Sequence, residues 1–354
     1  MAGTNEYGLG PFTFPRGWFM VAASSEVTTK PLAVRYFGQD LVLYRGESGN
    51  AYMVDAYCPH MGTHLAKNTT SYVVQDRKHV EGESIRCPYH AWRFGPDGKC
   101  NEIPYSDTRI PAAAKLNILK LQERYNCIFA WHDAEGGEPH FDLPEIAEWD
   151  DPAYVHWEAD QLGTLPCHPQ EVIDNMADVG HLGPVHGGYP EYFVNEINGI
   201  VLRQLQGAPH RTLAPGELLQ TNTFYTGPGI LLSYFNGNSG VMYITHTPVD
   251  DGVIKAWHAF LYKSPNAVAT AEDAEIARMA QAGSLAALAQ DFEIWGNKRA
   301  CINPLAVPGD GAFGKIRQWY KQFYNERAQE QKFQTLANGT YPVRGMPTHN
   351  QRVA

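Results

Sequence analysis

The sequence lacks two features that would point to nucleic acid or to a membrane: a basic region and a long apolar run. Its 28 Lys and Arg residues face 38 Asp and Glu residues, which gives a net charge of −10 over 354 residues. Residues 1–150 and 151–354 each carry 14 basic and 19 acidic side chains, so the negative charge is spread over the chain. Because nucleic acid is normally bound by a basic surface, the sequence argues against such a partner.

Apolar runs and cysteines are also scarce. The run from Trp18 to Ala23 is far shorter than the about 20 residues of a transmembrane helix. No basic segment precedes a long apolar stretch, so an export signal is not indicated. Six cysteines in a chain of this length do not resemble a disulfide framework. We therefore expect a cytoplasmic protein without a transmembrane segment.

The length suggests two domains, and turn-rich segments indicate where they divide. Residues 1–15 are rich in Gly, Pro and Thr and are expected to form an N-terminal arm. Strand-like segments separated by turns predict an antiparallel meander at the start of a first domain over residues 16–145. Three of these segments cover residues 34–37, 41–44 and 51–56. The acidic segment from Glu145 to Pro152 marks the expected end of this domain.

The second domain is expected over residues 146–340, with a polar tail at residues 341–354. Turns separate four strand-like segments, which predict an antiparallel sheet over residues 218–225, 230–235, 241–247 and 254–262. The apolar side chains of this sheet could line a large pocket or form ordinary core; they include Phe224, Leu232, Tyr234, Tyr243, Trp257 and Phe260. A long helix is predicted from Thr270 to Arg299, with a break near Gly283 and Ser284.

Two short loops each combine one cysteine with one histidine: Cys58-Pro59-His60 and Cys87-Pro88-Tyr89-His90. A Rieske [2Fe–2S] centre needs two Cys on one iron and two His on the other, and two such loops suit that division. A zinc site is the alternative, although zinc sites usually group two Cys in one loop and two His in another. The pattern therefore favours a [2Fe–2S] cluster bound by Cys58, His60, Cys87 and His90.

A second group of polar residues lies between Glu171 and His186. Four of them share one helical face at steps of four, three and three: Glu171, Asn175, Asp178 and His181. His186 follows His181 by five residues, and Gly183 with Pro184 between them predicts a helix break. A broken helix end can turn the two imidazoles toward one point.

Asp291 offers a carboxylate that could complete a metal site. It lies on an apolar face of the predicted helix, where its neighbours are Ala287, Leu288, Ile294 and Trp295. A carboxylate in such a place needs a salt bridge or a metal ion. Two neutral imidazoles and one carboxylate leave positions open on ferrous iron. The sequence thus predicts a mononuclear Fe(II) site at His181, His186 and Asp291.

The two cysteine–histidine loops, which continue to Gly62 and to Trp92, resemble the Rieske motif of the Rieske non-haem iron oxygenases. The likeness covers nearly the whole chain, and within the family it is strongest to the oxygenase components of 3-ketosteroid 9α-hydroxylases. The segments that carry this finer likeness are Asp55–Cys58, Ile103–Tyr105, Gln290–Trp295 and Trp319–Tyr324. The separation of His60 from Cys87 is longer than is usual in the family, and we interpret residues 69–80 as a loop insertion.

The resemblance implies a role for each candidate residue. Residues that bind the cluster in the family match Cys58, His60, Cys87 and His90, and those that hold ferrous iron match His181, His186 and Asp291. The residue matching Asp178 hydrogen-bonds a cluster histidine of a neighbouring subunit and a ligating histidine of its own chain. These histidines would be His90 and His181. Asn175 matches a residue that lies near the iron without binding it strongly.

The resemblance also implies an α+β fold, in which an all-β Rieske domain precedes a helix-grip-like catalytic domain of antiparallel sheet and flanking helices. The implied function is the oxygenase component of a multi-component monooxygenase, which uses O2 at Fe(II) to hydroxylate a hydrophobic, steroid-like substrate. Electrons would come from NAD(P)H through a partner reductase or ferredoxin, and the chain would form a homotrimer. Alternatives are a steroid or sterol desaturase, an O- or N-demethylase, or an aromatic-ring hydroxylase. A pure Rieske electron carrier would leave the second metal site without a purpose.

Overall fold

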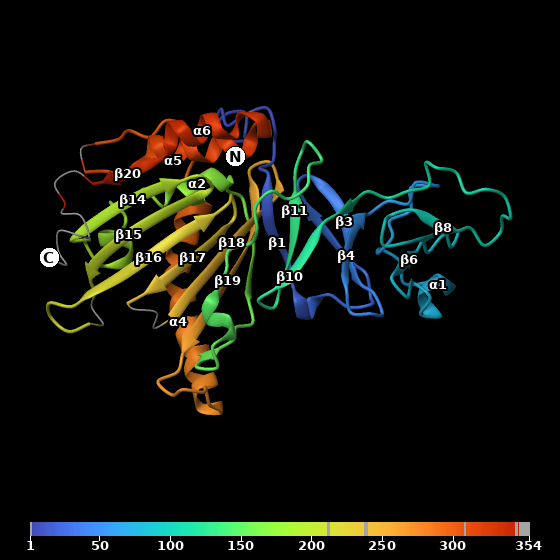
Figure 1. The fold of residues 1–354 in the computed structure, drawn as a ribbon, viewed down its shortest axis with the longest axis horizontal. Helices are drawn as coiled ribbons and strands as arrows, with labels where there is room; N and C mark the ends of the chain where they lie inside the picture. The colour runs from blue at the N-terminus through green and yellow to red at the C-terminus, as the bar shows by residue number, and fades with distance from the viewer. Residues whose placement is uncertain (1, 211–212, 237–239, 308, 344–345, 347–354) are drawn as a thin grey trace. The chain divides into compact units, whose positions relative to one another are not determined.

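The computed structural model describes residues 2–210, 213–236, 240–307, 309–343 and 346. Figure 1 shows the helices and strands that these residues form. Contacts within the chain divide it into two compact units, Met20–His132 and Met1–Phe19 with Asp133–Ala354. The smaller unit therefore ends before the boundary that the acidic segment suggested, and residues 133–145 belong with the larger unit.

The smaller unit consists of short antiparallel sheets. The strands are β1 (Gly17–Ala23), β2 (Leu32–Tyr36), β3 (Gln39–Arg45), β4 (Ala51–Asp55), β5 (Val80–Glu81), β6 (Ser84–Arg86), β7 (Arg93–Phe94), β8 (Cys100–Glu102), β9 (Ile118–Leu119), β10 (Leu121–Arg124) and β11 (Cys127–His132). They pair in the orders β1-β11-β10, β2-β3-β4-β9 and β5-β6-β7-β8. The predicted meander is confirmed as β2, β3 and β4. Val42 and Val54 of this meander share one hydrophobic cluster with Cys58 and Cys87, so the core of the unit extends to both loops.

The inserted residues 69–80 are not entirely loop. They include a short helix, α1 (Tyr72–Gln75), and reach the first residue of β5. The Nε2 atom of His79, a residue only 7% exposed, lies 2.6 Å from the carbonyl oxygen of Leu65. Tyr72, by contrast, is 78% exposed. The insertion is thus anchored at its end and presents its helix to solvent.

Among the described residues, the larger unit is built on a nine-stranded sheet. The strands are β12 (Tyr154–Val155), β13 (Asp160–Leu165), β14 (Tyr192–Asn198), β15 (Val201–Pro209), β16 (Leu218–Thr226), β17 (Ile230–Phe235), β18 (Gly240–Asp250), β19 (Val253–Lys263) and β20 (Gly339–Pro342). Their order is β12-β19-β18-β17-β16-β15-β14-β20, with β13 also paired to β19. The four predicted strands correspond to β16, β17, β18 and β19, all antiparallel. Side chains on one face of these strands form one wall of the cavity described below.

Helices cover this sheet. They are α2 (Pro169–Asp174), α3 (Leu182–His186), α4 (Ala271–Asn297), α5 (Phe313–Tyr320) and α6 (Glu330–Ala337). Figure 1 shows α5 and α6 lying together beside β14 and β20. The helix α4 instead contacts β19 and α3. Ile173 of α2 and Trp319 of α5 are fully buried against Leu202 of the sheet, so this side of the sheet forms the main core.

The predicted break in the long helix is wrong, because α4 continues through Gly283 and Ser284. Ser284 Oγ lies 3.0 Å from His258 Nε2 on β19, and Gln281 Oε1 accepts the Phe260 N–H at 3.2 Å. These bonds attach the middle of the helix to the sheet. They offset the cost of about 1 kcal/mol that a glycine imposes on a helix interior.

The two chain ends also differ from what their composition suggested. Thr4 is 2% exposed and donates from Oγ1 to the Thr13 carbonyl at 2.7 Å, and Leu9 belongs to the main core. The first residues are therefore packed into the larger unit rather than forming a separate arm. Within the predicted tail, Tyr341 lies in β20 and Val343 is 3% exposed. Residues 344–345 and 347–354 of that tail lie outside the described residues.

We expect the buried His168 to make the stability of the larger unit depend on pH. Its Nδ1 accepts the Gln170 N–H at 3.0 Å at the start of α2, and its Nε2 lies 3.0 Å from Thr4 Oγ1. Burial lowers the pKa of His168 to about 4, from an ordinary value near 6.5. Between these two pH values the unfolded chain binds the proton and the folded chain does not, so stability falls as pH falls. We expect this histidine to remove about 3 kcal/mol of unfolding free energy between pH 7 and pH 4.

Urea unfolding at several pH values tests this expectation. His168→Asn keeps an acceptor at the start of α2 but cannot take up a proton in this range. The variant should therefore lose less stability on acidification than the parent protein. An identical pH dependence in the two proteins would show that His168 is not the group that titrates.

Candidate metal centres

His181, His186 and Asp291 come together in the larger unit. One ligand atom from each lies within 4.8 Å of the other two. His186 Nε2 is 3.3 Å from Asp291 Oδ2, and His181 Nε2 is 3.7 Å from Asp291 Oδ1. The two imidazole rings are 5.1 Å apart and nearly perpendicular, at 79°. Two nitrogens and one carboxylate that converge in this way suit a divalent iron ion.

The backbone conformation that brings these ligands together differs from the predicted one. The helix α2 ends at Asp174, and residues 175–181 form turns before α3 begins. Gly183 and Pro184 do not break a helix but lie in the first turn of α3, where a missing N–H costs nothing. A Cβ at Gly183 would come 2.2 Å from the Tyr189 ring, so a larger residue there would force this exposed ring to move.

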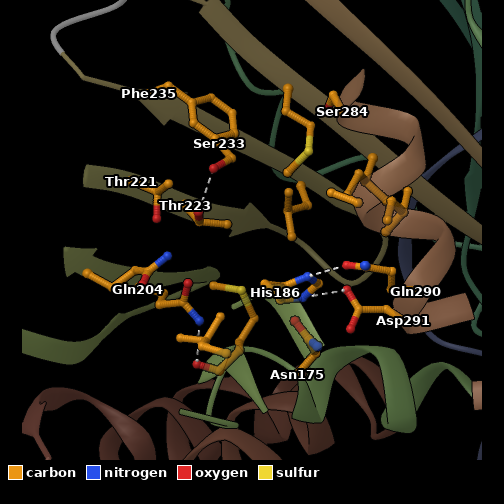
Figure 2. Close-up of a pocket in the computed structure, with 18 of the residues that line it drawn as sticks. Asn175, His186, Gln204, Thr221, Thr223, Ser233, Phe235, Ser284, Gln290 and Asp291 are labelled. Atoms are coloured by element: carbon orange, nitrogen blue, oxygen red, sulfur yellow. Dashed lines mark hydrogen bonds and ion pairs between the residues drawn. The ribbon is translucent and has the colours of Figure 1, made fainter. Parts of the chain in front are cut away.

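Each histidine is oriented through its second ring nitrogen. The Nδ1–H of His181 donates to the peptide carbonyl of Asp178, and that of His186 lies 3.1 Å from Gln290 Oε1. Both contacts leave Nε2 free to bind a metal ion. The hydrogen bond to Asp291 raises the pKa of His186. Figure 2 shows His186 with its two partners, Gln290 and Asp291, which are adjacent residues of α4.

The other predicted residues of this stretch lie in three different places. Asn175 Nδ2 is 3.2 Å from His181 Nε2, so its amide faces the three candidate ligands. Asp178 Oδ1 accepts the His181 backbone N–H at 3.2 Å, and its side chain is 43% exposed. Glu171 lies elsewhere, because it pairs with Lys298 and accepts the Cys301 N–H at 2.8 Å. The predicted helical face is therefore wrong, because α2 ends at Asp174. Asn175 and Asp178 still lie next to His181, whereas Glu171 does not.

Gln290 was not singled out from the sequence as a site residue, although its position next to Asp291 was a signal. We expect Gln290→Leu to weaken iron binding by about 10–100-fold, because His186 Nδ1 loses its acceptor. Competition with a chelator measures the change. Gln290→Glu is the matched control, since it keeps an acceptor and should bind iron nearly as well as the parent. Unchanged affinity in Gln290→Leu would contradict the orienting role.

A cavity of ≈ 680 Å³ opens beside the three candidate ligands. It lies between α4, the α2–α3 segment and the inward face of β15 to β19 (Figure 2). Its apolar lining includes Val172, Met176, Leu182, Leu219, Leu231, Phe235, Met242, Ile244, Phe260, Leu288 and Trp295. The sequence left open whether such residues line a pocket or form core. Of the six sheet residues that the sequence offered for such a pocket, Phe260 alone lines this cavity. Leu232, Tyr243 and Trp257 are buried in the core instead. The apolar side chains that do line the cavity suit an apolar ligand.

The smaller unit holds the two cysteine–histidine loops, which share one backbone pattern. The Cys58 N–H donates to the Thr63 carbonyl at 2.9 Å, and the Cys87 N–H donates to the Trp92 carbonyl at 2.8 Å. The fourth residue after each cysteine, Gly62 or Ala91, has φ of 71° or 58°. The left-handed residue closes each loop, and the cysteine at its base stays buried, at 2% and 1% exposure.

The donor set of these loops fits an iron–sulfur cluster. The Cys58 and Cys87 thiols hydrogen-bond each other, which lowers the pKa of Cys87 and raises that of Cys58. The two sulfurs are therefore close enough to bind one iron of a cluster. His60 Nδ1 is buried and has no hydrogen-bond partner among the described residues. The His60 ring lies 4.6 Å from that of His90 and stacks on Trp92 at 4.4 Å. The stacking fixes the ring of His60 and leaves its unpaired nitrogen available as a ligand.

Comparisons with known proteins identify the two domains that hold these residues. The family model described as the Rieske [2Fe-2S] domain matches residues 17–120, and that of the 3-ketosteroid 9alpha-hydroxylase C-terminal domain matches residues 130–324. The chain is 32% identical to the 3-ketosteroid-9-alpha-monooxygenase oxygenase component of Mycolicibacterium smegmatis, over 90% of this chain and 84% of that protein. It is 30% identical to cholesterol 7-desaturase of Caenorhabditis elegans, over 90% and 78%.

A solved structure has the same fold. NdmA of Pseudomonas putida CBB5 superposes with a TM-score of 0.70 at 17% identity, over 95% of this chain and 97% of that one. No helix among the described residues is both long and apolar enough to cross a membrane. The predicted family, fold class, enzyme class and two cofactors are confirmed. The chain belongs to the Rieske non-haem iron oxygenases, in the family of the 3-ketosteroid 9α-hydroxylase oxygenase components, which use a [2Fe–2S] cluster and a mononuclear iron.

Proposed function

We propose that this chain hydroxylates an apolar, steroid-like substrate with O2, as the oxygenase component of a multi-component monooxygenase. The observation that carries the proposal is the large apolar cavity that opens directly beside His181, His186 and Asp291. These three residues hold Fe(II), and Asn175 lies next to them without being a ligand. The bound iron supplies the oxygen-activating chemistry.

The residues around the iron bind and position the substrate and orient the two histidine ligands. The apolar lining binds the substrate, excludes water and holds one carbon near the metal. Gln290 and the Asp178 carbonyl keep both imidazoles in the tautomer that leaves Nε2 deprotonated. A substrate with many rings and few polar groups suits the predominantly apolar lining. Related enzymes named as a 3-ketosteroid monooxygenase and a cholesterol desaturase favour a steroid nucleus.

Cys58, His60, Cys87 and His90 would hold a [2Fe–2S] cluster, which would supply single electrons for the reaction at the iron. Histidine ligation raises the potential of such clusters to roughly −150 to +300 mV, within reach of a reductase or ferredoxin that draws on NAD(P)H. The exposed carboxylate of Asp178 lies beside His181 and is available to a further donor. We infer that this donor is His90 of a neighbouring chain in a homotrimer, so that electrons cross between subunits.

Desaturation is the second candidate function. Cholesterol 7-desaturase matches most of this chain, and removal of two hydrogens needs the same iron and oxidant as hydroxylation. Demethylation and aromatic hydroxylation have less support, because the likeness to NdmA shows a shared fold alone.

A single-turnover assay tests these proposals without a partner protein. Chemically reduced protein is mixed with O2 and with 3-ketosteroids, sterols or methoxylated aromatic acids, and products are identified by mass spectrometry. We expect a steroid product that has gained one oxygen atom. A steroid that has lost two hydrogens would assign desaturation instead. Formaldehyde and a demethylated acid, with every steroid unchanged, would refute the steroid assignment.

A further inference from the structure

The cavity carries two buried oxygens that the described part of the chain leaves unsatisfied. Gln206 Oε1 and Thr221 Oγ1 are each buried and have no hydrogen-bond partner among the described residues. Gln206 is 9% exposed and Thr221 is 8% exposed, and both line the cavity. Because buried polar atoms normally find a partner, these two atoms indicate one that the protein itself does not provide.

The two side chains are close enough to share a single ligand group. Gln206 on β15 lies directly opposite Thr221 on β16 in the antiparallel register. Residues in such a pair have Cβ atoms about 4.5–5.5 Å apart on the same face of the sheet. One polar atom of a ligand can therefore contact both the amide oxygen and the hydroxyl.

Other polar residues of the cavity already have partners. Thr223 Oγ1 and Ser233 Oγ, also a register pair, lie 2.6 Å apart and hydrogen-bond each other. Gln204 Nε2 donates to the Met176 carbonyl at 3.2 Å. The lack of a partner is therefore a property of Gln206 and Thr221 and not of every polar side chain on this wall.

The unsatisfied pair lies away from the metal ligands. Figure 2 shows Thr221 beyond Thr223 along β16, on the opposite side of the view from Asp291. Phe235 lies opposite Thr221 in register, so the pair has an apolar neighbour. A ligand that reaches from the iron to this pair is long, apolar in the middle and polar at its far end.

We propose that Gln206 and Thr221 form a subsite for a hydroxyl group at the end of the substrate remote from the carbon that is attacked. A hydroxyl donates one hydrogen bond to Gln206 Oε1 and accepts one from Thr221 Oγ1. A ketone only accepts, so it pairs with the Thr221 hydroxyl and leaves Gln206 Oε1 unpaired unless the amide turns over. This inference rests on the proposed function and narrows the substrate class to steroid-like compounds with a terminal hydroxyl.

Binding of matched probes to the iron-loaded protein, measured anaerobically by equilibrium dialysis, tests the subsite. The probes are testosterone, androst-4-ene-3,17-dione and androst-4-en-3-one, which differ only at the ring carbon that carries hydroxyl, ketone or hydrogen. Dehydroepiandrosterone carries its hydroxyl on the ring at the other end of the steroid nucleus. It tests whether the steroid binds in the cavity with its two ends exchanged. We expect one of the two hydroxylated probes to bind about tenfold more tightly than the dione.

The double variant Gln206→Leu, Thr221→Val should remove this preference and leave binding of androst-4-en-3-one unweakened. Thr223→Val is the matched control, because it changes the same wall of the cavity and should keep the preference. Circular dichroism and iron content verify that each variant is folded and loaded.

The binding results distinguish failure of the hydroxyl subsite from failure of the steroid assignment. Equal binding of hydroxyl and ketone probes, tighter binding of the dione, or a preference that survives the double variant would overturn the subsite and leave the steroid assignment standing. If none of the four steroids binds, the steroid assignment fails and the subsite fails with it.

Discussion

Replacing Asp291 or His186 with Ala is expected to remove the mononuclear iron and to abolish turnover, while the [2Fe–2S] cluster remains. Each residue supplies one of three converging ligand atoms in the larger unit, and the ligands proposed for the cluster lie in the smaller one. Loss of a direct ligand should weaken iron binding by more than the about 10–100-fold that an orienting partner contributes. The iron content should therefore fall from about three to about two atoms per chain, because the cluster itself holds two.

Colorimetric iron analysis and the visible and electron paramagnetic resonance spectra of the cluster measure the two centres separately. Glu293→Ala is the matched control, because Glu293 is an exposed carboxylate only two residues after Asp291 on the same helix. It should keep both the iron and the activity. A full complement of iron in Asp291→Ala, with normal turnover, would show that the metal lies elsewhere.

Most of the strands could be predicted from the sequence, because their signal is local. In β16 to β19, β-branched and aromatic residues alternate between turns that contain Gly, Pro, Asn or Asp. The candidate ligands could be named for a similar reason. Cys58 with His60, and His181 with His186, are close pairs in sequence. The structure brings His181 and His186 together with Asp291 and places the Cys58 loop against the Cys87 loop.

The helices between the candidate ligands could not be predicted from periodicity. A regular helix through Glu171 would have carried all four polar residues on one face, yet α2 ends at Asp174. Gly183 packs against the Tyr189 ring, and Gly283 is tolerated because Ser284 is bonded to His258 on the sheet. Each of these contacts joins residues whose proximity depends on the complete fold.

Contacts between distant segments also explain why the sequence did not predict the packing of the chain ends or the pairing of Gln206 with Thr221 in the cavity. Tyr7 hydrogen-bonds Glu171, and Thr4 contacts His168, more than 150 positions along the chain. The pairing of Gln206 with Thr221 depends on the register of β15 and β16. A turn-rich composition or a single strand pattern contains no information about such partners.

Asp178→Ala is expected to leave both metal centres filled and to stop electron transfer between them. The Asp178 peptide carbonyl, which any residue retains, accepts the His181 Nδ1–H, so the ligand keeps its tautomer. What is lost is a carboxylate that is 43% exposed and lies 3.7 Å from that same nitrogen. If this carboxylate links His181 to His90 of a neighbouring chain, its removal interrupts the hydrogen-bonded path between the two centres.

The rate at which a chemically reduced cluster is reoxidised by O2 in the presence of substrate measures this step directly. The parent protein should reoxidise rapidly with formation of product, and Asp178→Ala should reoxidise slowly without product, at unchanged iron content. Asp178→Glu keeps a carboxylate and should recover part of the rate, which a purely structural role would not predict. Normal reoxidation in Asp178→Ala would refute the relay between subunits. Loss of iron from that variant would instead assign Asp178 to holding the metal site, because the carbonyl alone would then be insufficient to fix His181.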